Sequence, residues 1–219
     1  MTGRPLRLYD YAASCNCYKV RLLLAHLGTA YERIPTDIFA GETLTDEYAR
    51  MNPTRTTPVL ETADGIRLVE SNAILLYLAR GTQYLPDESV ELAQTVRWLI
   101  YEQTDVVPMI GGLRFRILTS RLKPTDPDAV RRAAGAQEVL ELLDDHLAGR
   151  EFFVADRYTI ADIAIYGYTH LAHEAGIDMQ PYPNVRAWLD RVARQPGYIE
   201  DVEPYGANAA PGAGRSLYD

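Results

Sequence analysis

The hydrophobic and polar positions of the chain follow two different periods, and the change falls near residue 86. Before it, short apolar runs of strand character alternate with runs at helical spacing; after it, only helical spacing appears. The pattern predicts strands at 6–9, 31–35, 58–61 and 66–69, and helices at 19–27, 44–51 and 71–80. The order β-α-β-α-β-β-α predicts a parallel βαβ pair followed by a hairpin, which gives a mixed sheet covered by helices.

Turn residues fall where this pattern needs them. Gly28 and Gly81 follow two of the predicted helices and are good helix-ending signals. Asn52-Pro53 ends the helix at 44–51, because the residue before a proline is pushed out of the helical region. Asp64-Gly65 separates the last two strands and predicts a tight hairpin.

The second half of the chain is predicted to be all-helical. Its helical segments are 88–119, 128–147, 163–173 and 183–193. Pro108 and Gly111-Gly112 predict a kink or break in the first of these segments. Thr159-Ile160-Ala161-Asp162 has the form of a capping box at the start of the third.

Two domains fit this pattern. We expect an α/β domain at residues 1–81, a linker at 82–87 and an all-helical domain at 88–205. Residues 206–219 are rich in glycine and alanine and predict a loose C-terminal tail.

Composition narrows the function. The net charge of −8 over 219 residues argues against binding to nucleic acid or to an anionic membrane, because both need a basic patch. No window approaches the eighteen apolar residues of a membrane span, and the N-terminus lacks the apolar core of a signal peptide. The two cysteines are separated by one residue, and no ligand pair with zinc spacing follows. We therefore expect a cytoplasmic protein without a metal site.

Candidate chemistry gathers at the start of the first predicted helix. Ser14, Cys15, Asn16 and Cys17 lie where the helix should begin. The first N–H groups of a helix have no partner within it, and the helix dipole is positive there, so a thiolate can be stabilised. The same residues are also those that commonly cap helices for stability alone. Both interpretations fit this stretch taken by itself.

Four motifs together resemble a known family. They are SCNCYKVRLLLAHLG at 14–28, Asn52-Pro53 leading to Thr57–Leu60, Glu70–Leu78 (ESNAILLYL), and Thr159–Ile163 (TIADI). Their order, spacing and the two-domain layout resemble the cytosolic glutathione transferases, and among these the bacterial theta- or nu-like members with a serine or threonine at the site. The similarity spans about residues 6–200.

The resemblance implies a thioredoxin-like first domain that binds glutathione as co-substrate. Pro58 corresponds to the family's cis-proline, which would aim the backbone of Thr57 at the cysteinyl part of glutathione. Glu70 and Ser71 would hold the γ-glutamyl end, since one offers a negative charge to the ammonium and the other a hydroxyl to the carboxylate. The resemblance also implies a homodimer and a hydrophobic electrophile as second substrate.

The chain departs from the family where a cation is usual. Thr43-Leu44 and Thr56 stand at positions where many members carry a lysine, histidine or glutamine that holds the glycine carboxylate of glutathione. Arg55 is the candidate substitute.

Three residues are candidates for catalysis, and several activities stay open. Ser14 matches the family's hydroxyl residue, which would donate a hydrogen bond to the glutathione thiolate, and Asn16 matches an asparagine that assists at the sulfur. Cys15 offers an alternative, a mixed disulfide with glutathione in a thiol–disulfide oxidoreductase, and Cys17 fits a small buried side chain. A zeta-type maleylacetoacetate isomerase and a non-catalytic dimeric ligand-binding protein are the remaining alternatives.

Overall fold

The chain forms two compact units. The structure is a computed structural model that describes residues 4–218. The N-terminal unit holds the chain up to Leu78 together with the chain from Ile199 onward, and the helical unit holds Ala79–Tyr198. No helix among residues 4–218 is both long and apolar enough to cross a membrane.

The N-terminal unit is built on the predicted mixed sheet. Its strands are β1 (Leu6–Asp10), β2 (Tyr31–Pro35), β3 (Val59–Glu61) and β4 (Arg67–Val69). They lie in the order β2-β1-β3-β4, with β1 parallel to β2 and the other pairs antiparallel. The hairpin between β3 and β4 turns at Gly65, whose φ of 80° is the left-handed backbone that glycine tolerates. The mixed thioredoxin-like sheet is therefore confirmed.

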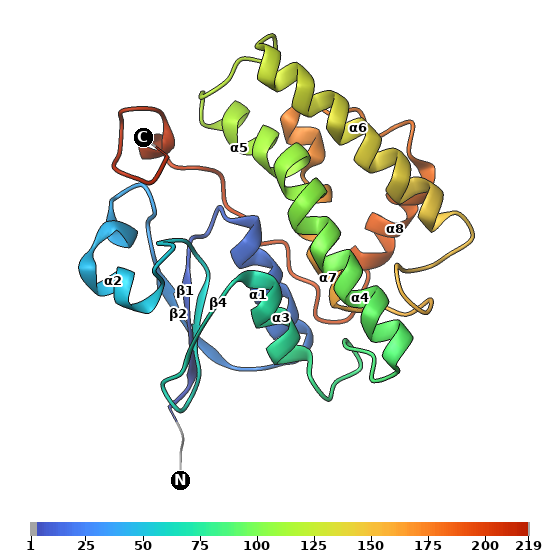
Figure 1. Ribbon diagram of the computed structural model, residues 1–219, viewed down its shortest axis with the longest axis horizontal. Helices are drawn as coiled ribbons and strands as arrows, with labels where there is room; N and C mark the ends of the chain where they lie inside the picture. The colour runs from blue at the N-terminus through green and yellow to red at the C-terminus, as the bar shows by residue number, and fades with distance from the viewer. Residues whose placement is uncertain (1–3, 219) are drawn as a thin grey trace. The chain divides into compact units, whose positions relative to one another are not determined.

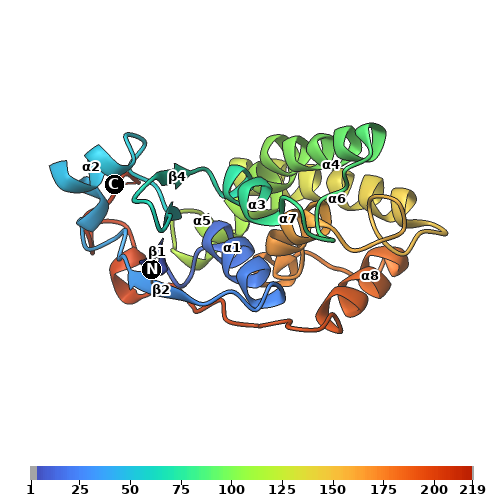
Figure 2. The same ribbon diagram turned by 90° about the horizontal axis from the view of Figure 1, so that it is seen from below.

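Helices cover the sheet on both sides. They are α1 (Cys15–His26), the short 3-10 helix η1 (Glu42–Leu44), α2 (Asp46–Met51) and α3 (Ser71–Ala79). Figures 1 and 2 show α1 and α3 next to each other on one side of the sheet and α2 on the other. The buried core between the sheet and α1 and α3 consists of Leu8, Val20, Leu24, Leu60 and Ile74. Burial of such aliphatic side chains supplies about 1.5–3 kcal/mol each.

One predicted helix is split. The pattern predicted a continuous helix at 44–51, whereas η1 ends at Leu44 and α2 begins at Asp46. Thr45 lies between them in extended conformation, and its hydroxyl accepts a hydrogen bond from the Tyr48 N–H at 3.2 Å. A threonine in this position caps a new helix start, which interrupts the preceding turn.

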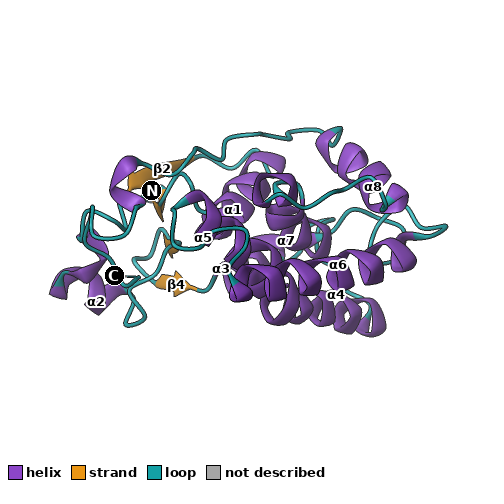
Figure 3. Cartoon of the chain, turned by 90° about the horizontal axis from the view of Figure 1, so that it is seen from above, coloured by secondary structure: helices purple, strands orange, loops and turns teal. Residues whose placement is uncertain are grey.

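The helical unit follows the predicted segments (Figure 3). Its helices are α4 (Ser89–Tyr101), η2 (Glu102–Gly111), α5 (Gly112–Leu118), α6 (Pro127–Leu147), α7 (Ile160–Thr169), η3 (Ala172–Ala175) and α8 (Pro183–Ala193). The interruption expected around Pro108 takes the form of the π-helix η2. Proline has no N–H to donate within a helix, and a π-helical segment is one of the ways a helix accommodates that loss. Arg132 Nη1 donates to the Pro108 carbonyl at 2.6 Å.

The predicted capping box at α7 is present and buried. The Thr159 hydroxyl accepts from the Ala161 N–H, and Asp162 accepts from the Thr159 N–H at 2.9 Å. Asp162 also accepts from the Phe153 N–H and from Trp188 Nε1, at 3.1 and 3.0 Å. One carboxylate thus joins the start of α7 to the preceding loop and to α8.

Asp162 gives the helical unit a defined pH response. Burial raises the pKa of Asp162 to about 6, although its hydrogen bonds act in the opposite direction. Since this value exceeds the unfolded value of about 3.9, the stabilising contribution is present at low pH and is lost as the pH rises through about 6.

We expect the stability advantage of the wild type over Asp162→Asn to fall as the pH rises from about 4 to about 6.5, because asparagine does not titrate. Chemical denaturation of both proteins at a series of pH values measures this difference. A difference that stays constant over the window would contradict a raised pKa of Asp162 in the folded protein.

The C-terminal segment differs from expectation. Residues from Ile199 onward belong to the N-terminal unit, so the predicted 88–205 domain ends earlier in the structure. Where the composition suggested a loose tail at 206–219, the structure forms a short 3-10 helix, η4 (Ala207–Ala209), and the Arg215 N–H donates to the Phe39 carbonyl at 2.8 Å. The loose tail was predicted from the glycine and alanine content of 206–219. The same small residues also allow two backbones to pack closely, so this composition does not distinguish a loose tail from a docked one.

Candidate active site at the start of helix α1

The first turn of α1 is capped by Ser14. The Ser14 backbone is extended, and its hydroxyl oxygen accepts a hydrogen bond from the Cys17 N–H at 3.3 Å. The Ser14 N–H in turn donates to the Tyr11 carbonyl at 2.9 Å. No acidic side chain stands in the first turn of α1. The positive end of the helix dipole is therefore not compensated by the helix itself, which favours an anion at this position.

The Ser14 hydroxyl makes two contacts with Cys17: its oxygen accepts from the Cys17 N–H, and it hydrogen-bonds the Cys17 thiol, so donation to a ligand would replace the second contact. A serine hydroxyl has one proton and two lone pairs, and the bond from Cys17 occupies one lone pair. Ser14 is partly exposed, whereas the side chains of Cys15 and Cys17 are buried, at 3% and 0% exposure. Of Ser14, Cys15 and Cys17, Ser14 is thus the most exposed to a ligand.

Cys17 is a packing residue with an unreactive thiol. Burial raises the pKa of Cys17 to about 12, and the nearby Asp10 carboxylate acts in the same direction. Hydrogen bonds from Thr57, Tyr11 and Ser14 oppose the shift, including that of the Tyr11 N–H to Sγ at 3.5 Å. The thiol stays protonated near neutral pH, and its contacts bring Ser14 and Thr57 to the same place.

The start of α3 lies against the start of α1. The Ser71 hydroxyl donates to Asn16 Oδ1 at 3.2 Å, which leaves the Asn16 amide nitrogen available as a donor. One turn further along α1, Lys19 Nζ donates to Oδ1 of Asn72, the residue after Ser71, at 3.1 Å. The four predicted positions Ser14, Asn16, Thr57 and Ser71 are therefore brought together.

Glu70 has a strained backbone. Its φ is 69°, in the left-handed region that costs a residue with a side chain about 1 kcal/mol. The Glu70 carbonyl accepts from the Ile74 N–H at 2.9 Å, so the strained residue begins α3, and its side chain is exposed. A strained residue at a candidate site is a reason to suspect function, since stability alone would select glycine or asparagine.

The Thr57–Pro58 peptide bond is cis, as the resemblance predicted. The segment before it is tied down by hydrogen bonds to the Thr56 carbonyl, which accepts from the Tyr48 hydroxyl and from Asn52 Nδ2, both at 2.8 Å. The backbone of Thr57 is thereby presented by a rigid loop. Thr56 itself supplies no charge.

Arg55 points toward the segment where the family cation was missing. Its Nη1 donates to the Leu44 carbonyl and, at 3.4 Å, to the Thr45 carbonyl. Thr43 is buried, with 1% of its surface exposed. The guanidinium thus lies beside Leu44, although its present contacts hold that loop and its nearest carboxylate is that of Asp46 at 4.0 Å.

A group of buried ion pairs holds helix α1 through Arg21. It was not predicted from the sequence. Arg21 Nη1 contacts Asp10 Oδ1 at 2.5 Å, and both side chains are fully buried. Arg21 Nε lies 2.9 Å from Asp201 Oδ2, and Arg33 also pairs with Asp10. Although burial opposes it, the carboxylates of Asp10 and Asp201 raise the pKa of Arg21. The sequence signal was a charged residue in the middle of the apolar run 19–27.

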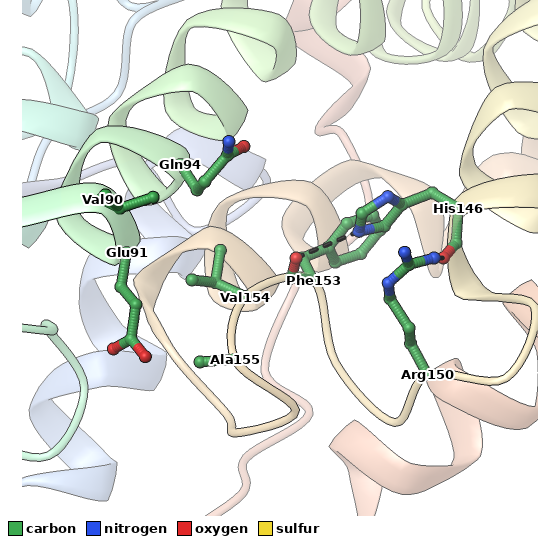
Figure 4. A pocket seen from close by; sticks show the side chains of 8 residues that line it. All are labelled: Val90, Glu91, Gln94, His146, Arg150, Phe153, Val154 and Ala155. Carbon is green, nitrogen blue, oxygen red and sulfur yellow. Dashed lines mark hydrogen bonds between the residues drawn. The ribbon is translucent and has the colours of Figure 1, made fainter.

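A separate concavity lies in the helical unit (Figure 4). It measures about 330 Å³ and is lined by Val90, Glu91, Gln94, His146, Arg150, Phe153, Val154 and Ala155. None of the site residues predicted from the sequence lines it. Among residues 4–218, no cluster of histidine, cysteine and carboxylate side chains has the form of a metal site.

The fold consists of a thioredoxin-like domain, whose helix α1 begins at the candidate site, followed by a helical domain. Comparison with protein families matches residues 4–80 to the glutathione S-transferase N-terminal domain and residues 127–191 to the glutathione S-transferase C-terminal domain. The chain belongs to the glutathione S-transferase family.

Similar proteins include enzymes of more than one description. The disulfide-bond oxidoreductase YfcG of Escherichia coli is 30% identical over 194 residues, covering 85% of this chain and 89% of that protein. A glutathione S-transferase structure from Pseudomonas fluorescens has a TM-score of 0.87 and 37% identity, covering 90% of this chain and 99% of the other. A glutathione transferase from Burkholderia graminis, solved with two glutathione molecules per subunit, has a TM-score of 0.79 and 30% identity, covering 89% and 85%.

Proposed function

We propose that this protein is a glutathione transferase of the serine type, which binds glutathione in the N-terminal unit and activates its thiol. The observation that carries the proposal is the meeting of Ser14, Asn16, Thr57 and Ser71 at the uncompensated start of α1. Glutathione in the solved structure of the Burkholderia graminis relative supports the choice of ligand.

Glutathione would be held at three points. Ser71 and the start of α3 would receive the γ-glutamyl carboxylate, and the exposed Glu70 carboxylate would receive its ammonium. The Thr57 backbone would pair with the cysteinyl residue, as the family resemblance implies. Arg55 would offer its positive charge to the glycine carboxylate, since its guanidinium lies beside Leu44, next to the neutral Thr43.

Activation would come from stabilising the thiolate. The free glutathione thiol has a pKa near that of cysteine, about 8.5, so little of it is ionised at neutral pH. The Ser14 hydroxyl would donate to the sulfur and the Asn16 amide would assist, while the α1 dipole favours the anion. The thiol proton leaves to solvent, and the thiolate attacks an electrophile held close by.

A glutathione-dependent disulfide reductase is the second candidate, because of the similarity to YfcG. A bound glutathione thiolate would attack one sulfur of a disulfide, form a mixed disulfide and release the other sulfur as a thiolate. In the Cys-type alternative, Cys15 would instead become linked to glutathione. Ser14 is partly exposed and Cys15 is 3% exposed, which favours Ser14 over Cys15 as the group at the glutathione sulfur. A mass increase of one glutathione after treatment with glutathione disulfide, absent in Cys15→Ala, would favour it.

The finer assignments rest on family resemblance. We propose a bacterial theta- or nu-like member that acts as a homodimer in the cytoplasm on hydrophobic electrophiles. Cys15 and Cys17 are buried thiols that form no disulfide with each other, which suits a reducing compartment.

An activity panel tests the proposed function. Glutathione is supplied with an aryl halide, a hydroperoxide, a disulfide or maleylacetone, and the wild type is compared with Ser14→Ala. Turnover of at least one substrate that depends on both glutathione and Ser14 is expected. Turnover of maleylacetone alone would favour an isomerase, and glutathione binding without turnover of any substrate would favour a ligand-binding protein.

Glu70→Gly should separate affinity from stability. Glycine relieves left-handed strain of about 1 kcal/mol but adds a similar cost in chain entropy, so the unfolding midpoint is expected to stay close to that of the wild type. The KM for glutathione is expected to rise about tenfold, the value of one charge-assisted hydrogen bond. Steady-state kinetics and thermal unfolding measure the two effects.

Glu70→Gln is the matched control, because it removes the charge and keeps the side chain. It should raise the KM similarly without relieving strain. An unchanged KM in both variants would remove Glu70 from the glutathione site.

A further inference from the structure

The last part of the N-terminal unit, residues 199–218, runs back along the elements that form the candidate site; we call it the C-terminal strap. Its first contacts are with α1. The Tyr18 hydroxyl donates to the Ile199 carbonyl at 2.7 Å, and Arg21 donates to both the carboxylate and the carbonyl of Asp201, at 2.9–3.1 Å. The strap is thereby anchored to the same buried ionic group that supports α1.

The next contacts are with the turn that precedes Ser14. The Glu203 N–H donates to the Ala12 carbonyl at 3.2 Å. The Tyr205 ring lies 6.4 Å from the Tyr11 ring, and both rings pack on Phe39. The strap thus contacts two residues of the turn before Ser14: Ala12 through a backbone hydrogen bond and Tyr11 through a ring contact.

The strap ends on the segment between β2 and η1 (Figure 1). Asn208 Nδ2 donates to Asp37 Oδ2, and the Arg215 N–H donates to the Phe39 carbonyl, both at 2.8 Å. Gly214 passes so close that a Cβ there would collide with the carbonyl oxygens of Phe39 and Asn208. Only glycine at 214 permits this docking.

Tyr11 connects the strap to Ser14. Its ring contacts Tyr205, and its hydroxyl hydrogen-bonds the backbone of Gly206, while its carbonyl receives the Ser14 N–H and its N–H meets Cys17 Sγ. Tyr11 therefore contacts the strap through its side chain and Ser14, the cap of α1, through its backbone.

We propose that the C-terminal strap positions the Tyr11–Ser14 turn for thiol activation, with Tyr205 and Gly214 as its positioning residues. This inference rests on the proposed function. Glu70 and Ser71 are assigned to hold the γ-glutamyl end of glutathione. None of the strap contacts described above involves either residue. Loss of docking should therefore act on the thiolate more than on glutathione affinity.

Gly214→Ala tests this in the full-length protein, with Ala213→Ser as control because Ala213 is exposed. We expect faster hydrogen exchange in the strap, a kcat lowered about tenfold, and a pKa of the bound glutathione thiol raised by about one unit, since a hydrogen-bond donor aimed less well stabilises the thiolate less. The KM for glutathione should change less than about twofold, because the contacts that Glu70 and Ser71 would make with glutathione in both the ground and transition states are left in place. Ala213→Ser should match the wild type.

Tyr205→Ala is a second, independent substitution in the strap. It should change strap hydrogen exchange, kcat and the bound-thiol pKa in the same direction as Gly214→Ala, again with little effect on the KM for glutathione. If the strap exchanges faster in either variant while kcat and the bound-thiol pKa remain at wild-type values, the strap has no positioning role. If Gly214→Ala leaves strap exchange unchanged, the close approach on which the proposal stands is absent. A wild type that shows no bound thiolate contradicts the proposed function itself, and the strap's catalytic role with it.

Discussion

Replacing Ser14 by alanine is expected to lower glutathione-dependent turnover about tenfold to a hundredfold, the value of one hydrogen bond to a charged group. The physical reason is the double use of this hydroxyl. Its oxygen accepts from the Cys17 N–H as the cap of α1, and its proton would be donated to the thiolate that the helix start favours. Steady-state kinetics on the best substrate of the activity panel measures the loss.

Ser14→Thr is the matched control, since threonine keeps the hydroxyl and also caps helices; it should retain most of the activity. Ser14→Ala removes the cap as well, at about 1 kcal/mol of stability. Thermal unfolding therefore accompanies the kinetics, to show that the variant is folded at the assay temperature. Wild-type turnover in folded Ser14→Ala would exclude Ser14 as the activating residue.

Replacing Asp10 by alanine is expected to destabilise the N-terminal unit by about 3 kcal/mol, because it leaves a buried arginine short of a partner. Asp10 and Arg21 are both fully buried, and Asp201, which is 34% exposed, remains as the second carboxylate. Arg33, the other partner of Asp10, is 34% exposed and can turn to water. Urea denaturation measures the change in the free energy of unfolding.

The double variant Asp10→Leu with Arg21→Met separates the two causes of instability. Removing both charges leaves no buried ion without a partner, so the double variant should be more stable than Asp10→Ala. A double variant that loses as much as or more than the single would mean that the ionic group itself, rather than the uncompensated charge, stabilises the fold.

The sequence predicted the elements of the fold well because their signals are local. Alternation, helical spacing and the Asp64-Gly65 turn depend on neighbours in the chain, and the mixed sheet and the capping box at Thr159 followed from them. The split at Thr45 was missed, since a threonine inside a helical pattern is ambiguous between helix interior and cap. Docking of residues 206–218 was missed as well, because its contacts are with Asp37 and Phe39, which are distant from it in the sequence.

Candidate site residues could be chosen from the sequence where a motif contained them, but their surroundings could not be predicted. Ser14, Asn16, Thr57 and Ser71 could be selected from the sequence, but only the structure shows the Ser71–Asn16 hydrogen bond. The strain at Glu70 and the inaccessibility of Cys15 likewise depend on tertiary packing. The choice between Ser14 and Cys15 rests on that exposure.

The central claim is that the start of α1 stabilises a glutathione thiolate, and the pKa of the bound thiol tests it most directly. Ultraviolet absorbance of the thiolate, titrated in the wild type and in Ser14→Ala at saturating glutathione, gives this value. We expect a pKa at least one unit below the free value of about 8.5 in the wild type, and a return toward that value in Ser14→Ala. A wild-type value equal to that of free glutathione would contradict the account.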